Sequence, residues 1–130
     1  MIHQHFKVDY DYPVYFAEEI FHPENNQFAK IFDECGIVAG SKFLFVIDSN
    51  VAKSHPDLNR DLSNFFTKSK FTSADVPLII EGGEASKNDF GIINKILEAI
   101  DRNKIDRHSF VVGIGGGALL DVVGFAAAIA

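Results

Sequence analysis

The chain has 130 residues, of which 47% are hydrophobic and 23% are charged, a composition typical of one globular domain rather than a disordered chain. Its formal net charge of −6 provides no general cationic surface for a phosphate backbone or an anionic bilayer, so neither nucleic acid nor a membrane is expected as a partner. The single cysteine, Cys35, excludes an intrachain disulfide, and the polar N-terminus has no apolar signal region. These features favour a cytoplasmic protein.

The first half of the chain predicts two strands and two helices. Val14 to Ala17 is interpreted as a short strand, and Gln27 to Cys35 as a helix that Gly36 follows as the residue after the C-cap. The continuous apolar run from Lys42 to Ile47 (KFLFVI) predicts a strand that is covered on both faces. The polar stretch from Asp57 to Lys70 has its apolar residues on one side and predicts a helix.

The second half of the chain continues the alternation. Val76 to Ile80 (VPLII) predicts a strand in which Pro77 must lie at an edge or at the start, because proline has no N–H to donate. Asp89 to Arg102 has isoleucine and leucine at helical spacing and predicts a helix. Phe110 to Ile114 (FVVGI) predicts another strand, and a helix is expected from about Ala118 to the end.

Strands and helices alternate from about residue 40 onward, which is typical of βαβ units. We therefore predict an α/β fold with a parallel sheet and helices on both faces. Ligands of such sheets bind beyond the carboxyl ends of the strands. Polar or glycine-rich segments follow the three clearest strands at residues 48–50 (DSN), 81–87 (EGGEASK) and 115–118 (GGGA). These segments are expected to lie along one edge of the sheet.

The glycine run is the most informative of the three segments. Gly115 to Gly117 lie between a strand and a helix, where their backbone can approach a ligand and free N–H groups can bind phosphate oxygens. Gly113 to Ala118 fits the pattern GxGxxA, and a tight strand–helix turn without a ligand stays open as an alternative. Asp48 is placed either to accept hydrogen bonds from a ribose or to cap the next helix.

Other charged residues are candidates for the same site. Glu84 and Lys87 flank a glycine turn, where they can contact ribose and phosphate or form a solvated ion pair. Asp121 is expected to be buried near the positive end of the last helix, held either by a ligand or by backbone N–H groups of a loop. No metal site is assigned to the histidines, and no catalytic Ser/His/Asp set can be assembled from the spacing.

Three ordered blocks resemble a known family. They are DSN at 48–50, GEASK at 83–87 and GGGALLDVVGFAA at 115–127. They are similar to the blocks DxN, GE with a lysine three residues later, and GGGVxGDxxGFxAA in the N-terminal domain of 3-dehydroquinate synthase and related sugar phosphate cyclases. The similarity covers roughly residues 40–130. Ala118 and Leu120 depart from the family's valine and glycine, and EGGE at 81–84 departs from its Pro-x-Gly-Glu, which leaves the substrate open.

The resemblance implies a Rossmann-like domain that binds NAD, as the N-terminal part of a two-domain enzyme. It places Asp48 and Asn50 at the adenosine ribose and Glu84 and Lys87 on the same dinucleotide. The remaining cofactor-binding positions that it implies, toward the pyrophosphate and the nicotinamide, are Gly116, Gly117, Ala118 and Asp121. No catalytic or metal-binding residue is assigned within this chain.

The resemblance also implies a reaction. The family consists of phosphate-eliminating lyases of the shikimate pathway that close the ring of a heptulosonate 7-phosphate, a small sugar phosphate, with NAD as a transient oxidant. It further implies a homodimer, and zinc or cobalt in a helical domain beyond Ala130. Because the last helix is apolar on all sides and has no C-cap glycine, residues 1–130 are expected to be one domain of a longer protein. Alone, they are expected to be inactive and to self-associate through the apolar surface of residues 122–130.

Three alternatives stay open. The first is a related cyclase that acts on another heptulose phosphate. The second is an iron-type alcohol or glycerol dehydrogenase, whose GGGSxxD turn also fits Gly115 to Asp121, although the residues that follow, VVGFAA, match the cyclase pattern. The third is a non-catalytic nucleotide-binding module that serves as an interaction domain.

Overall fold

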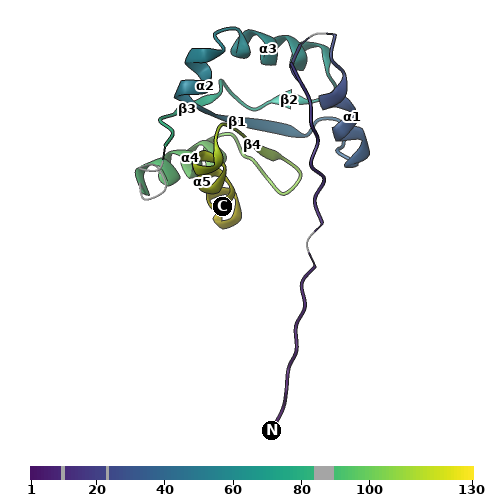
Figure 1. Ribbon diagram of the computed structural model, residues 1–130, viewed down its shortest axis with the longest axis vertical. Helices are drawn as coiled ribbons and strands as arrows, with labels where there is room; N and C mark the ends of the chain where they lie inside the picture. Colours follow the sequence, from purple (N-terminus) through teal and green to yellow (C-terminus); the bar gives the residue numbers. More distant parts are fainter. Residues whose placement is uncertain (10, 23, 84–89) are drawn as a thin grey trace.

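The computed structural model describes residues 1–9, 11–22, 24–83 and 90–130, and it contains a parallel sheet with helices on both sides (Figure 1). The α/β, Rossmann-like fold predicted from the alternation of elements is confirmed. The strands are β1 (Lys42–Asp48), β2 (Thr72–Ser73), β3 (Leu78–Ile80) and β4 (Phe110–Ile114). The helices are α1 (Gln27–Glu34), α2 (Ser49–Ser54), α3 (Leu58–Lys68), α4 (Phe90–Arg102) and α5 (Gly117–Ile129).

Strand β1 is the centre of the sheet. On one side it pairs with β4, from Phe43 opposite Phe110 to Ile47 opposite Ile114. It also pairs with β2 at its amino end and with β3 at its carboxyl end. Because a strand has only two edges, β2 and β3 are successive pieces of one outer strand. Pro77 lies directly before β3, and its missing N–H explains why the ladder is interrupted there.

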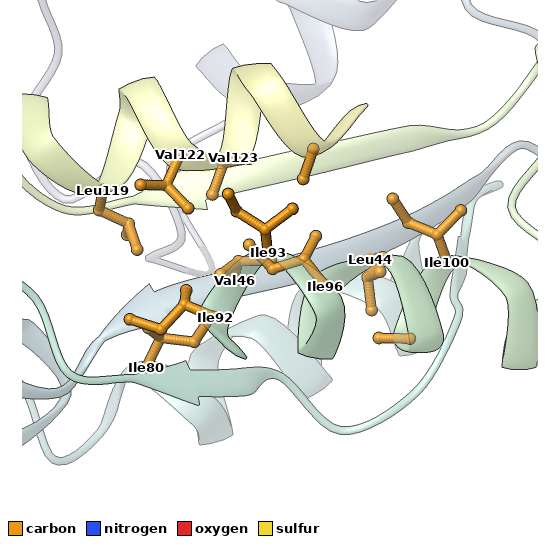
Figure 2. Packing of buried hydrophobic residues seen from close by; sticks show 12 residues of the cluster. Leu44, Val46, Ile80, Ile92, Ile93, Ile96, Ile100, Leu119, Val122 and Val123 are labelled. Atoms are coloured by element: carbon orange, nitrogen blue, oxygen red, sulfur yellow. The ribbon is translucent and has the colours of Figure 1, made fainter. Parts of the chain in front are cut away.

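The side chains of β1 alternate between two apolar clusters, which explains why its sequence is apolar without interruption. Leu44 and Val46 pack against α4 and α5 on one face, and Figure 2 shows isoleucines of α4 and Leu119, Val122 and Val123 of α5 around them. Phe43, Phe45 and Ile47 pack against phenylalanines of α1 and against α3 on the other face. The apolar side chains Phe43 to Ile47 of β1 are at most 1% exposed, so both faces are covered as predicted.

The four predicted helices are confirmed, with ends that differ by up to two residues. Gly36 adopts a φ of 67°, the conformation expected of the residue that follows a C-cap. The six-residue helix α2 and the two-residue strand β2 are additional elements that the periodicity did not predict. None of the described helices has the length and apolar character needed to cross a membrane.

One prediction about the N-terminal end of the chain is wrong. Residues 14–17 form no strand, because they pair with no other strand of the described chain, and Phe16 is 93% exposed. At the other end, the apolar surface expected over residues 122–130 is present in part, and self-association through it stays a prediction. Val122, Val123 and Ala126 are buried within the domain itself, whereas Phe125 and Ile129 are about half exposed.

Candidate functional site

The carboxyl ends of β1, β3 and β4 lie side by side at one edge of the sheet. In the parallel register, Asp48 is opposite Ile80 of β3 and Ile47 is opposite Ile114 of β4. The segments that follow the three strands therefore leave the sheet at the same edge, as expected. Within the second segment, Glu84 and Lys87 lie outside the described residues.

Asp48 is the polar side chain at the centre of this edge. It is 9% exposed, and it is the N-cap of α2, where its Oδ1 atom accepts a hydrogen bond from the backbone N–H of Asn50 at 2.8 Å. The capping role that was one of two alternatives is therefore present. It does not exclude a ligand, because an ionised carboxylate has further lone pairs with which to accept hydrogen bonds. Asn50 lies in the first turn of α2 and is exposed.

Two glycines enclose Asp48 from the neighbouring strand ends. A Cβ atom on Gly82 would overlap the Cγ and Oδ2 atoms of the Asp48 carboxyl group. A Cβ atom on Gly115 would lie 2.9 Å from the Cβ of Asp48 and 2.7 Å from the Cδ2 of Leu119. Both approaches are closer than van der Waals contact permits, so a side chain at either position would force Asp48 or its neighbours to shift. The sequence did not identify Gly82 as a site residue. Its contact with Asp48 arises because β3, which ends just before Gly82, pairs with β1, which ends at Asp48.

The turn between β4 and α5 is open. Gly116 is the N-cap of α5 and supplies no side-chain hydrogen bond, and the first turn of the helix has no acidic residue. A Cβ atom on Gly116 or Gly117 would meet no atom within 4 Å, and both residues are exposed. Space is therefore open beside Gly116 and Gly117, at the positive end of α5, as the pyrophosphate of a dinucleotide requires.

The remaining predicted residues lie on α5. Ala118 is half-buried in the first turn, next to the open glycines. Asp121 is exposed, so the prediction of a buried carboxylate is wrong. The helix directs Leu119, Val122 and Val123 toward the sheet, and Asp121 falls on its other side, one helical turn after Gly117.

The structure brings together Asp48, Asn50, Gly116, Gly117 and Ala118 from the ends of β1 and β4. These residues fit a nucleotide, because they combine a carboxylate at a strand end with the first backbone N–H groups of a helix, which the N-cap residue Gly116 does not cap. They do not fit a metal ion. Across residues 1–9, 11–22, 24–83 and 90–130, no three or more His, Cys, Asp or Glu side chains are grouped to hold one.

Comparison with known proteins leads to one family. Residues 77–130 match the family model described as 3-dehydroquinate synthase N-terminal. The chain is 33% identical to the 3-dehydroquinate synthase of Natranaerobius thermophilus over 117 residues, which are 90% of this chain and 28% of that protein. It is 38% identical to that of Bartonella quintana over 89 residues, 68% of this chain and 22% of that protein. The chain thus spans about a quarter of the length of these curated relatives. No solved structure gives a significant match.

Proposed function

The chain belongs to the 3-dehydroquinate synthase family, and from this premise we propose that it is the NAD-binding N-terminal domain of a 3-dehydroquinate synthase. One observation carries the proposal. The carboxyl ends of three parallel strands converge on Asp48, next to the open glycine turn at the start of α5. This is the edge at which open α/β sheets bind nucleotides.

Different residues at the carboxyl edge of the sheet bind different parts of NAD. The backbone N–H groups at Gly116 and Gly117 bind the pyrophosphate, with the positive end of the α5 dipole behind them. The carboxylate of Asp48 accepts hydrogen bonds from the hydroxyls of the adenosine ribose, and Asn50 lies beside it on α2. Asp121, exposed on the next turn of α5, contacts the nicotinamide side in this proposal.

The chemistry of the whole protein is part of the same proposal. NAD supplies a transient oxidation of a substrate hydroxyl that is later reversed, while residues of this chain bind and orient the dinucleotide. The reaction is the cyclisation of a heptulosonate 7-phosphate with elimination of phosphate, a step of the shikimate pathway. We place the divalent metal, zinc or cobalt, on residues outside this chain. Family membership supports a cytoplasmic location and a homodimeric state.

The first test is the binding of NAD⁺ by the protein, measured by isothermal titration calorimetry. We expect saturable binding that an Asp48→Asn substitution weakens about tenfold, because a hydrogen bond to a charged group contributes about 1.5 to 3 kcal/mol. Absence of NAD⁺ binding, or equal affinity in both proteins, contradicts the proposal.

The second test separates a cyclase from a dehydrogenase in the full-length protein. With a heptulosonate 7-phosphate as substrate, we expect release of inorganic phosphate without net formation of NADH. Stoichiometric NADH would instead identify a dehydrogenase. Residues 1–130 alone are expected to give no turnover, and full activity from them would overturn the assignment of the catalytic residues to another part of the protein.

A further inference from the structure

We propose that Gly82 is a positioning residue for Asp48. In this proposal, the missing side chain at residue 82 keeps the Asp48 carboxylate in the orientation that presents it to a ribose. The contact itself is independent of any ligand, and its effect on dinucleotide binding rests on the proposed function.

Asp48 is held by three contacts. Its Oδ1 atom accepts the N–H of Asn50 at 2.8 Å, and its Cβ lies against Gly115, where an added Cβ would be only 2.9 Å away. Its Cγ and Oδ2 lie against Gly82. The carboxylate is therefore fixed by its own helix cap and by the ends of both neighbouring strands.

Space, rather than backbone conformation, disfavours a side chain at residue 82. Gly83, the next residue, has a φ of 109°, a conformation that favours glycine for itself. Gly82 does not adopt a positive φ of that kind, so its backbone accepts alanine. The three heavy atoms nearest to an added Cβ all belong to the carboxyl group of Asp48.

A side chain at residue 82 would disturb either Asp48 or the end of β3. Rotation of Asp48 away from a new methyl group would break the hydrogen bond from Asn50, and the contact at Gly115 limits movement of its Cβ. The carboxylate would have to leave its orientation, or the end of β3 would have to move. In either case the Asp48 carboxylate is no longer held in one orientation before the ligand binds. Binding of a dinucleotide that depends on this orientation therefore weakens.

The test compares Gly82→Ala with the matched control Gly124→Ala. Gly124 is an exposed glycine of α5 around which an added Cβ would meet no atom within 4 Å. Affinities are measured by calorimetry for NAD⁺ and for an analogue whose adenosine ribose lacks the 2′-hydroxyl. In the unaltered protein and in Gly124→Ala we expect NAD⁺ to bind about tenfold more tightly than the analogue, as one charge-assisted hydrogen bond predicts.

Gly82→Ala is expected to weaken NAD⁺ binding about tenfold and to reduce the preference over the analogue to nearly one. A purely structural disturbance would weaken both ligands equally and keep the preference, and that result overturns the proposal. It is overturned too if Gly82→Ala binds both ligands as the unaltered protein does.

A double-mutant cycle tests whether Gly82 acts through Asp48. In an Asp48→Ala background the obstacle is gone, so Gly82→Ala should change neither the affinity for NAD⁺ nor the melting temperature. A further loss in that background shows that Gly82 acts by another route. If Gly82→Ala alone fails to fold, recovery of folding in the double variant supports the proposal, and failure of both overturns it.

The melting temperatures distinguish a failure of the proposed NAD binding from a failure of the proposed role of Gly82. If the unaltered protein does not bind NAD⁺, the proposed function fails. The contact between Gly82 and Asp48 is then still tested, because Gly82→Ala should lower the melting temperature when Asp48 is present and not when it is absent.

Discussion

The two edges of the sheet use their polar groups in different ways. At the amino edge, side chains close the connections between elements. The Nζ atom of Lys42 donates to the main-chain oxygens of Asn103 and Lys104 at 3.1 and 3.3 Å, beyond the end of α4. The carboxylate of Asp106, ahead of β4, accepts from the hydroxyl of Ser109 at 2.7 Å and from the N–H of His108 at 3.0 Å.

At the carboxyl edge the arrangement is the reverse. The N-cap residue of α5, Gly116, has no side chain to cap the helix, and Gly82 and Gly115 admit Asp48 where other residues would carry side chains. The polar groups of the amino edge are therefore bonded within the domain and support its stability. Those of the carboxyl edge can bind a ligand. Substitutions at the two edges should therefore separate stability from binding.

The largest effect is expected for Gly115→Val. Its side chain would overlap Leu119 and Asp48, and overpacking of this kind costs about 1 to 3 kcal/mol of stability. NAD⁺ binding should weaken as well, because the same site holds Asp48. Urea denaturation and calorimetry measure the two effects, with Gly124→Ala as the control. Unchanged stability would show that the strand ends are not tightly packed around Asp48.

Lys42→Met tests the amino edge. It removes the bonds to the main-chain oxygens of Asn103 and Lys104, and we expect a loss of about 1 kcal/mol in the free energy of unfolding. NAD⁺ affinity should stay unchanged, because Lys42 begins β1 and Asp48 ends it. A loss of affinity in a variant that stays folded would contradict the separation of the two edges.

Gly117→Asp should change stability and binding in opposite directions. An acidic residue in the first turn of α5 interacts favourably with the helix dipole, so stability should rise by about 0.3 to 1 kcal/mol. The same charge repels a pyrophosphate, and NAD⁺ affinity should fall about tenfold or more, at least 1.4 kcal/mol. Gly117→Asn is the uncharged control. Equal NAD⁺ affinities of the two variants would argue against an anion site at this turn.

The smallest effect concerns Asp106 and pH. The hydroxyl of Ser109, followed by the N–H of His108, lowers the pKa of this carboxyl group. Because the pKa is lower in the folded state, the contribution to stability is present above the unfolded pKa of about 4 and is lost as the pH falls through the folded value. The melting temperatures of the unaltered protein and Asp106→Asn should therefore differ at pH 7 and converge in acid. A constant difference at every pH would contradict this.

Much of the fold was predictable because the signals are local and strong. The apolar run that becomes β1, the strand from Phe110 to Ile114 and the periodic helix that ends at Arg102 all lie where the sequence predicted them. The glycine turn was predictable for the same reason, since three consecutive glycines between an apolar strand and a helix are a local signal. Short elements such as α2 and β2 lack enough residues for a periodic pattern, and tertiary contacts decide them.

Two aspects of the site were not predictable. The helix α5 is apolar on nearly all sides, so its sequence does not reveal which face packs on the sheet, and Asp121 was placed on the wrong side. The contact between Gly82 and Asp48 depends on the register between β1 and β3, which are separated by α2, α3 and β2. Spacing within one segment carries no information on such a contact.

The most direct test of the central claim is a titration of the ¹⁵N-labelled protein with NAD⁺, followed through the backbone amide signals. We predict that the largest shifts fall on Asp48 to Asn50 and on Gly115 to Ala118, while the amides of Asn103 to Ser109 at the opposite edge stay in place. The largest shifts at Asn103 to Ser109, with an unchanged glycine turn, would contradict the assignment of the dinucleotide to the carboxyl edge of the sheet.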